Sequence, residues 1–128
     1  MNSRQKALLV AELAKAKKAE DIVVLDMRKL SNVADFFIIA TAGSTRRAQA
    51  VIDNVENGLL KKREPLSNIA GYQDGRWILL DAYGVVAHIF DEELRRFYNL
   101  EGLWGEAPRV RLWQRKRRKL SRKPSKRR

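Results

Sequence analysis

The sequence predicts an α/β domain with a mixed β-sheet and helices, followed by a disordered basic C-terminal tail. Amphipathic stretches with helical spacing alternate with short β-branched runs, which is the pattern of a sheet covered by helices. The charge is unevenly distributed: 12 of the 27 Lys and Arg residues lie in residues 109–128, and the other 15 are balanced by the 15 Asp and Glu residues. A stretch so dense in one charge cannot bury an apolar face. We therefore assign residues 1–107 to the domain and residues 108–128 to the tail.

Composition narrows the possible functions. The 128 residues include no cysteine and a single histidine, which excludes disulfides, thiolate nucleophiles and Cys- or His-rich metal sites within one chain. We expect neither a metal nor a cofactor. The apolar stretch at residues 7–11 is far shorter than the roughly 20 residues that span a bilayer, so we expect no membrane segment and a cytoplasmic protein. The first helix is basic and amphipathic, which leaves an organellar origin as an alternative.

Three elements follow from the first 63 residues. Apolar residues recur at helical spacing over residues 3–18, and the runs at residues 21–27 and 35–42 are apolar without alternation, as in buried strands. Ser44 can then cap a helix over residues 45–63, which is the clearest helix in the chain. Its apolar stripe is Ala48, Val51, Ile52, Val55 and Leu59.

The second half of the body predicts three strands and a short helix. Residues 66–70, 76–81 and 85–90 read as strands, and the last two are joined by a tight turn at residues 82–84. Asp91 can cap a helix that ends near Tyr98. After it we expect three apolar residues to pack back on the body: Leu100, Leu103 and Trp104.

The strands at residues 76–81 and 85–90 hold the most informative polar residues. Alternation along a strand places Trp77, Leu79 and Asp81 on one face, and His88 lies on one face of the partner strand. No nucleophile accompanies Asp81 and His88, so a catalytic pair is the weaker interpretation. We expect too few helices to cover both sides of the sheet. These four residues then form a protein-binding surface with an aromatic anchor. The alternative is that Trp77 belongs to the core and that Asp81 and His88 only pin the hairpin.

Two other candidates are weighed in the same way. Gly43 and Ser44 stand between a strand and a helix, where backbone N–H groups could bind phosphate, as in nucleotidyltransferases. Those enzymes also need paired carboxylates for Mg²⁺, which the following strand lacks, so helix capping is favoured. The tail predicts RNA binding through its dense positive charge, with non-specific charge or a localisation signal as the alternative. Its candidate RNA-binding residues are Arg115, Lys116, Arg117, Arg118 and Lys119.

Several segments resemble one protein family. "DIVVLDMRKLSNVADFFIIATAGSTRRAQA", then "WILLD", "HIF" and "RRFYNLEGLW", are similar to the ribosomal silencing factor RsfS, or Iojap, family in order and spacing over about residues 4–104. The resemblance implies a nucleotidyltransferase-like fold without catalytic residues. It also implies a non-enzymatic protein that binds the large ribosomal subunit at large-subunit ribosomal protein fourteen, blocks subunit joining and so represses translation.

The chain departs from the family pattern at one end of the hairpin. Family members usually carry Glu-Gly where this chain has Ala70 and Gly71, and Gly-Asp near its Ala82, Tyr83 and Gly84. We therefore expect a reshaped turn with one acid fewer. The tail lies outside the resemblance, and we expect it to contact ribosomal RNA. A nucleotide-binding enzyme or an RNA-binding assembly factor for the large subunit is the alternative function, and both a monomer and a homodimer remain open.

Overall fold

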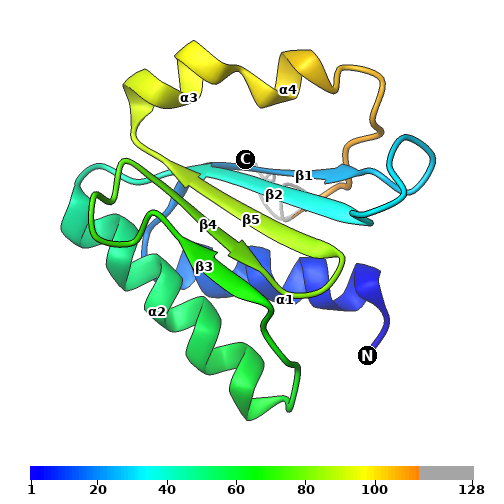
Figure 1. The fold of residues 1–128 in the computed structure, drawn as a ribbon, viewed down its shortest axis with the longest axis horizontal. Helices are drawn as coiled ribbons and strands as arrows, with labels where there is room; N and C mark the ends of the chain where they lie inside the picture. The colour runs from blue at the N-terminus through cyan, green and yellow to red at the C-terminus, as the bar shows by residue number, and fades with distance from the viewer. Residues whose placement is uncertain (113–128) are drawn as a thin grey trace, which may run out of the picture.

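The computed structural model describes residues 1–112 as one mixed α/β domain (Figure 1). The order of helices and strands is the predicted one, with one short helix added near the end. The elements are α1 Ser3–Ala16, β1 Glu20–Asp26, β2 Phe36–Thr41, α2 Thr45–Lys61, β3 Asn68–Ala70, β4 Trp77–Asp81, β5 Val85–Phe90, α3 Glu92–Tyr98 and α4 Leu100–Leu103.

The five strands form one sheet in the order β1-β2-β5-β4-β3. β2 and β5 pair in parallel, and the other neighbours pair antiparallel. The crossover between the parallel strands contains α2, as a parallel connection requires. The prediction of a mixed sheet that ends in an antiparallel hairpin is therefore confirmed.

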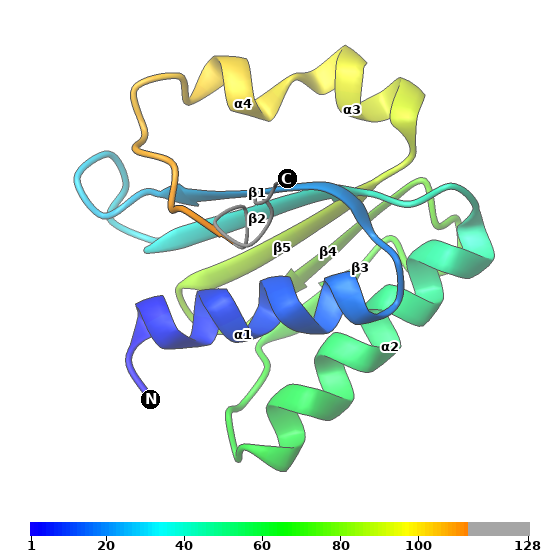
Figure 2. The ribbon, with the colours of Figure 1, turned by 180° about the vertical axis from the view of Figure 1, so that it is seen from behind.

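α1 and α2 lie side by side on one face of the sheet (Figures 1 and 2). The predicted stripe of α2 is fully buried there, facing Ile78, Leu80 and Ile89 from the strands. Ser44 caps the helix as predicted, because its Oγ accepts the N–H of Arg47 at 3.0 Å. These contacts make up the larger of two apolar clusters.

α3 and α4 lie on the opposite face (Figure 1). Asp91 caps α3 as predicted, its Oδ1 accepting the N–H of Leu94 at 2.7 Å. Arg95 fastens both helices to the sheet: one guanidinium nitrogen donates to Thr41 Oγ1 at 2.8 Å and another to Glu101 Oε2 at 2.8 Å. Burial alone would raise the pKa of Glu101, but the hydrogen bond and charge of Arg95 outweigh it and keep that pKa below its ordinary value.

α4 was not predicted, and one packing prediction fails with it. Asn99 adopts a left-handed conformation (φ 46°, ψ 57°) that ends α3 and caps α4. The break turns the chain, so that Leu100 and Trp104 pack on the second, smaller apolar cluster while Leu103 faces outward. The buried members of this cluster are Leu25, Met27, Ala34, Ile39, Phe90 and Ala107. Leu103 is 68% exposed, so the expectation that it packs back is wrong. Over the described residues, no helix has both the length and the apolarity needed to cross a membrane.

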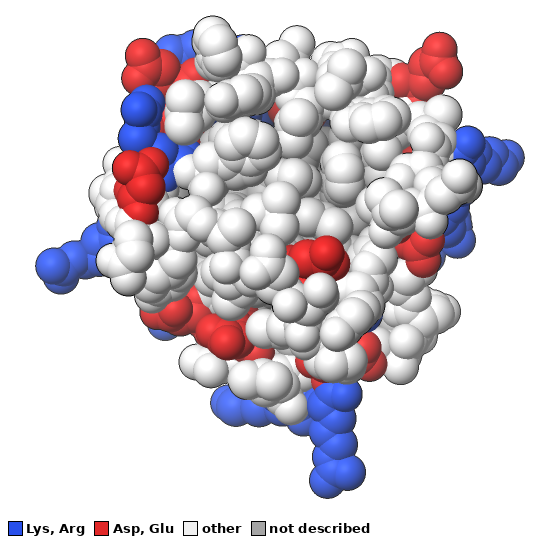
Figure 3. All heavy atoms as spheres, in the orientation of Figure 1, with Lys and Arg blue, Asp and Glu red and all other residues white. Residues whose placement is uncertain are grey.

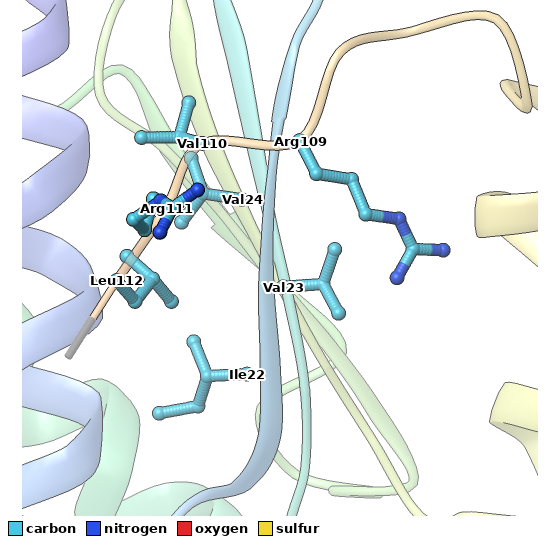
Figure 4. A pocket seen from close by; sticks show the side chains of 7 residues that line it. All are labelled: Ile22, Val23, Val24, Arg109, Val110, Arg111 and Leu112. Carbon is cyan, nitrogen blue, oxygen red and sulfur yellow. The ribbon is translucent and has the colours of Figure 1, made fainter. Parts of the chain in front are cut away.

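The body extends past the predicted boundary at residue 107. The backbone N–H of Asp26 donates to Pro108 O, and that of Val110 donates to Val24 O, both at 2.8 Å. Residues 108–112 thus lie antiparallel along the outer edge of β1. Residues 109–112 line a pocket of about 440 Å³ with Ile22, Val23 and Val24 (Figure 4). The predicted boundary was based on the charge density of this segment. Val110 and Leu112 are nevertheless apolar, and they pack on the core.

Candidate protein-binding face

The predicted binding residues lie on the sheet face that α3 and α4 only partly cover. We use the term open face for the half-exposed side chains on this surface together with His88, which lies among them. Its members come from three adjacent strands and are Phe37, Trp77, Leu79, Asp81, Val86 and His88. In Figure 3 the surface between α3–α4 and α2, where β4 and β5 come forward, is mostly uncharged, with acidic atoms within it and both acidic and basic side chains toward its margins.

Register explains why these residues meet. β5 pairs with β4 so that His88 lies opposite Leu79, and with β2 so that Val86 lies beside Phe37. Because side chains alternate along a strand, these pairs point to the same face. The sequence predicted that Trp77, Leu79 and Asp81 share one face of β4, and the register confirms this. The prediction missed Phe37, because β2 is apolar on both faces and no alternation reveals which residues point toward the open side.

Trp77 is half-buried and held on several sides. Its ring stacks on Phe90, with centroids 4.9 Å apart and planes at 26°, and lies 4.8 Å from the ring of Tyr98 on α3. Its indole Nε1–H donates to Nδ1 of His88 at 3.2 Å. The tryptophan therefore contributes to the second apolar cluster and also exposes part of its ring on the open face.

His88 lies beneath the open face and is only 5% exposed. The ring of Phe37 meets it edge-on at 4.8 Å. Burial lowers the pKa of His88 to about 4, so the imidazole is neutral near pH 7. Because Nδ1 accepts the indole hydrogen bond, the neutral ring carries its proton on Nε2. That atom is buried and has no hydrogen-bond partner among residues 1–112.

Asp81 does not pair with His88. It lies opposite Val86 in the hairpin, and its Oδ1 accepts the backbone N–H of Tyr83 at 3.0 Å. The register places His88 opposite Leu79, so Asp81 and His88 are diagonal neighbours on one face of the hairpin. A half-exposed carboxylate remains at the end of the open face.

The hairpin turn after Asp81 is a tight two-residue connection. Tyr83 and Gly84 both have positive φ, 53° and 90°, and the N–H of Ala82 donates to Val85 O at 2.9 Å. This geometry suits the right-handed twist of the paired strands. From the other layer, Lys6 of α1 donates to Ala82 O at 2.7 Å. The turn is thus closed and held by α1, and the ring of Tyr83 is exposed.

The structure adds less support to the other predicted sites. The Ser44 hydroxyl is already engaged in capping α2, which favours capping over phosphate binding. Residues 1–112 bring no group of three or more His, Asp or Glu together as a metal site. The predicted RNA-binding residues, Arg115 to Lys119, lie outside the described residues, so that prediction stands as made.

The fold and the open face define a mixed α/β domain with one closed and one half-open sheet face. The chain belongs to the family described as ribosomal silencing factor during starvation, whose model matches residues 1–128. Curated RsfS proteins from Halalkalibacterium halodurans and Bacillus subtilis are each 36% identical to it; the alignments cover 88% and 84% of this chain and 96% and 92% of theirs.

Organellar relatives and a solved structure agree with this assignment. The chloroplastic protein Iojap of Arabidopsis thaliana is 37% identical, over 83% of this chain and 44% of its own. A mouse protein named for mitochondrial assembly of the ribosomal large subunit is 27% identical, over 75% of this chain and 43% of its own. A crystal structure of a Chromobacterium violaceum protein superposes with a TM-score of 0.80 at 31% identity, covering 82% of this chain and 88% of that one.

Proposed function

We propose that this protein silences ribosomes by docking its open face on large-subunit ribosomal protein fourteen, where it blocks joining of the small subunit. The open face is the observation that carries this proposal. It is an apolar surface of Phe37, Leu79, Val86 and Trp77, left half-exposed in an otherwise covered sheet. Exposed apolar surface of this kind is typical of protein interfaces.

The chemistry of the open face suggests what its partner presents. A half-exposed tryptophan held from behind is suited to act as an anchor, because little ordering entropy is lost when it binds. Asp81, at the end of the face, would meet a Lys or Arg of the partner at the rim of the interface. The partner surface is therefore mostly apolar with one cation at its border.

Silencing of this kind needs no reactive group. A protein that occupies an intersubunit surface acts by excluding the other subunit, so area and shape are sufficient. The mouse relative's name refers to the large ribosomal subunit, which supports that subunit as the partner. The alternative of a nucleotide-binding enzyme would depend on Gly43 and Ser44, and the capping bond of Ser44 weighs against it.

Sedimentation of the protein with purified ribosomal subunits tests the proposal. We expect it to co-migrate with large subunits, not with small ones, and to lower the amount of joined ribosomes when added first. Leu79→Ala should weaken co-migration, whereas Leu60→Ala should not, because Leu60 is an exposed leucine of α2 away from the open face. Migration with neither subunit, or equal loss for both variants, would contradict the proposal.

We further propose that the tail contacts ribosomal RNA. A truncation that tests this contact must keep residues 108–112, because they pack against β1. Truncation after Leu112 should preserve the fold and reduce the salt dependence of large-subunit binding. If about six charges neutralise phosphates, the slope of log K against log salt should fall by roughly 4 to 5 units. An unchanged slope would exclude an RNA contact by the tail.

A further inference from the structure

His88 is energetically unfavourable for folding at its position. It is neutral, almost fully buried, and packed between the rings of Phe37 and Trp77. Its Nε2–H has no acceptor within the described residues, and a buried donor without an acceptor destabilises a fold. A leucine or phenylalanine would fill the same space without that penalty. The packing of the core therefore gives no reason for a histidine here.

The other nitrogen of the ring supplies a reason. Nδ1 accepts the indole N–H of Trp77 at 3.2 Å, and this is the hydrogen bond that fixes the rotation of the tryptophan ring. The ring contacts with Phe90 and Tyr98 restrain the plane of the indole, but stacking has no direction within that plane and does not by itself select where the N–H points. In a flipped ring the Nε1–H would no longer donate to His88 and would need water as its acceptor. The hydrogen bond thus selects one edge of Trp77 for display on the open face.

We infer that His88 is a positioning residue, which gives up folding stability to hold Trp77 in the orientation that the ribosomal partner recognises. This inference rests on the proposed function of the open face. It assigns His88 no direct contact with the partner, in contrast to the role that the sequence predicted. It also explains why a polar residue lies beneath an apolar surface. The neutral imidazole offers one acceptor, Nδ1, to the indole and adds little polar area to the open face.

Two substitutions separate positioning from packing because they change stability and binding in opposite directions. His88→Leu keeps the volume and removes both the unpaired donor and the acceptor, so stability should be equal or higher while large-subunit binding weakens about tenfold, which corresponds to about 1.4 kcal/mol. His88→Asn keeps an acceptor near the Nδ1 position but leaves a cavity. It should lower stability and bind within about threefold of the wild type, a difference below 1 kcal/mol.

A matched control excludes a general effect of lost stability. Ile89→Val destabilises the neighbouring position of β5, but on the face covered by α1 and α2, so binding should not change. The indole N–H signal of Trp77, assigned by its loss in Trp77→Phe, gives a direct readout of the hydrogen bond. It should exchange slowly with water in the wild type and in His88→Asn, and faster in His88→Leu.

The outcomes distinguish this inference from the proposed function. If Leu79→Ala weakens large-subunit binding while His88→Leu binds like the wild type, the open face docks and the positioning role of His88 is wrong. If His88→Leu is strongly destabilised and the tryptophan signal is unchanged, His88 serves packing only. If no substitution on the open face affects binding, the proposed docking face itself is wrong.

Discussion

The two faces of the sheet differ although the same strands build both. In β4, Ile78 and Leu80 are completely buried under α1 and α2, whereas the alternate residues Trp77 and Leu79 remain half-exposed. The closed face has the composition of a core, and the open face adds a carboxylate and a histidine to apolar residues. Neighbours in the sequence therefore differ in surroundings: one face forms the larger core, and the other is the face that we propose for recognition.

Helix length is the physical cause of the difference. α1 and α2 have 14 and 17 residues, so at 1.5 Å per residue they extend about 21 and 25 Å. A five-stranded sheet is about 19 Å wide between its outer strands. α3 and α4, with 7 and 4 residues, reach only about 10 and 6 Å. The short helices cannot cover the face on which they lie, which leaves an apolar surface half-exposed.

The largest effect should come from shortening one leucine of the closed face. Leu80→Ala should destabilise the fold by about 2 to 5 kcal/mol, because Leu80 is fully buried and its loss leaves a cavity. Leu79→Ala, one residue earlier on the open face, should cost clearly less. Urea unfolding of both variants measures the difference. Equal losses would mean that the two faces contribute alike to stability.

The free energy of unfolding should decrease in acid because His88 is buried in its neutral form. Burial lowers the pKa of His88 from 6.5 to about 4, so below pH 6.5 the unfolded chain binds a proton that the folded protein does not. Stability from this group is therefore constant above pH 7 and decreases as the pH falls toward 4, by about 3 kcal/mol in total. The difference in unfolding free energy between wild type and His88→Leu isolates it from the carboxylates. A difference that does not vary with pH would contradict the buried neutral ring.

Removal of the anchor should affect binding more than folding. Trp77→Ala should cost about 2 kcal/mol or more in large-subunit binding. Because the ring stacks on Phe90, we also expect a moderate loss of thermal stability. Trp77→Phe keeps the stack and loses the indole N–H, so it should fold normally and bind with intermediate affinity. Wild-type binding by Trp77→Ala would place the docking surface elsewhere.

The smallest effect should come from the carboxylate at the end of the open face. Asp81→Asn keeps an acceptor for the N–H of Tyr83 and removes only the charge, so the turn should be preserved. Charged pairs at an interface rim contribute little, and we expect a loss of about 1 kcal/mol or less that vanishes at high salt. Asp81→Ala should lose stability in addition. Tighter binding by Asp81→Asn would show that the partner is not cationic there.

Local patterns were sufficient for the helices and strands. The stripe of α2 and the serine at its N-cap predicted that helix, and the order of elements followed from alternation and turn residues. For the site, the period of two in β4 placed Trp77, Leu79 and Asp81 together. The turn sequence did not reveal which side chain contacts His88: the register sets His88 opposite Leu79 and lets it accept the indole N–H of Trp77.

The sequence by itself determined the helices and strands except α4, and which side chains of β4 and β5 share a face, because these properties depend on spacing along one segment. Only the tertiary structure decided that Phe37 joins the open face, since this depends on the parallel pairing of β2 and β5. It also decided that residues 108–112 close the edge of β1 and that His88 meets the indole of Trp77 rather than Asp81. These are contacts between distant segments, and they arise from strand register and packing, which no local pattern encodes.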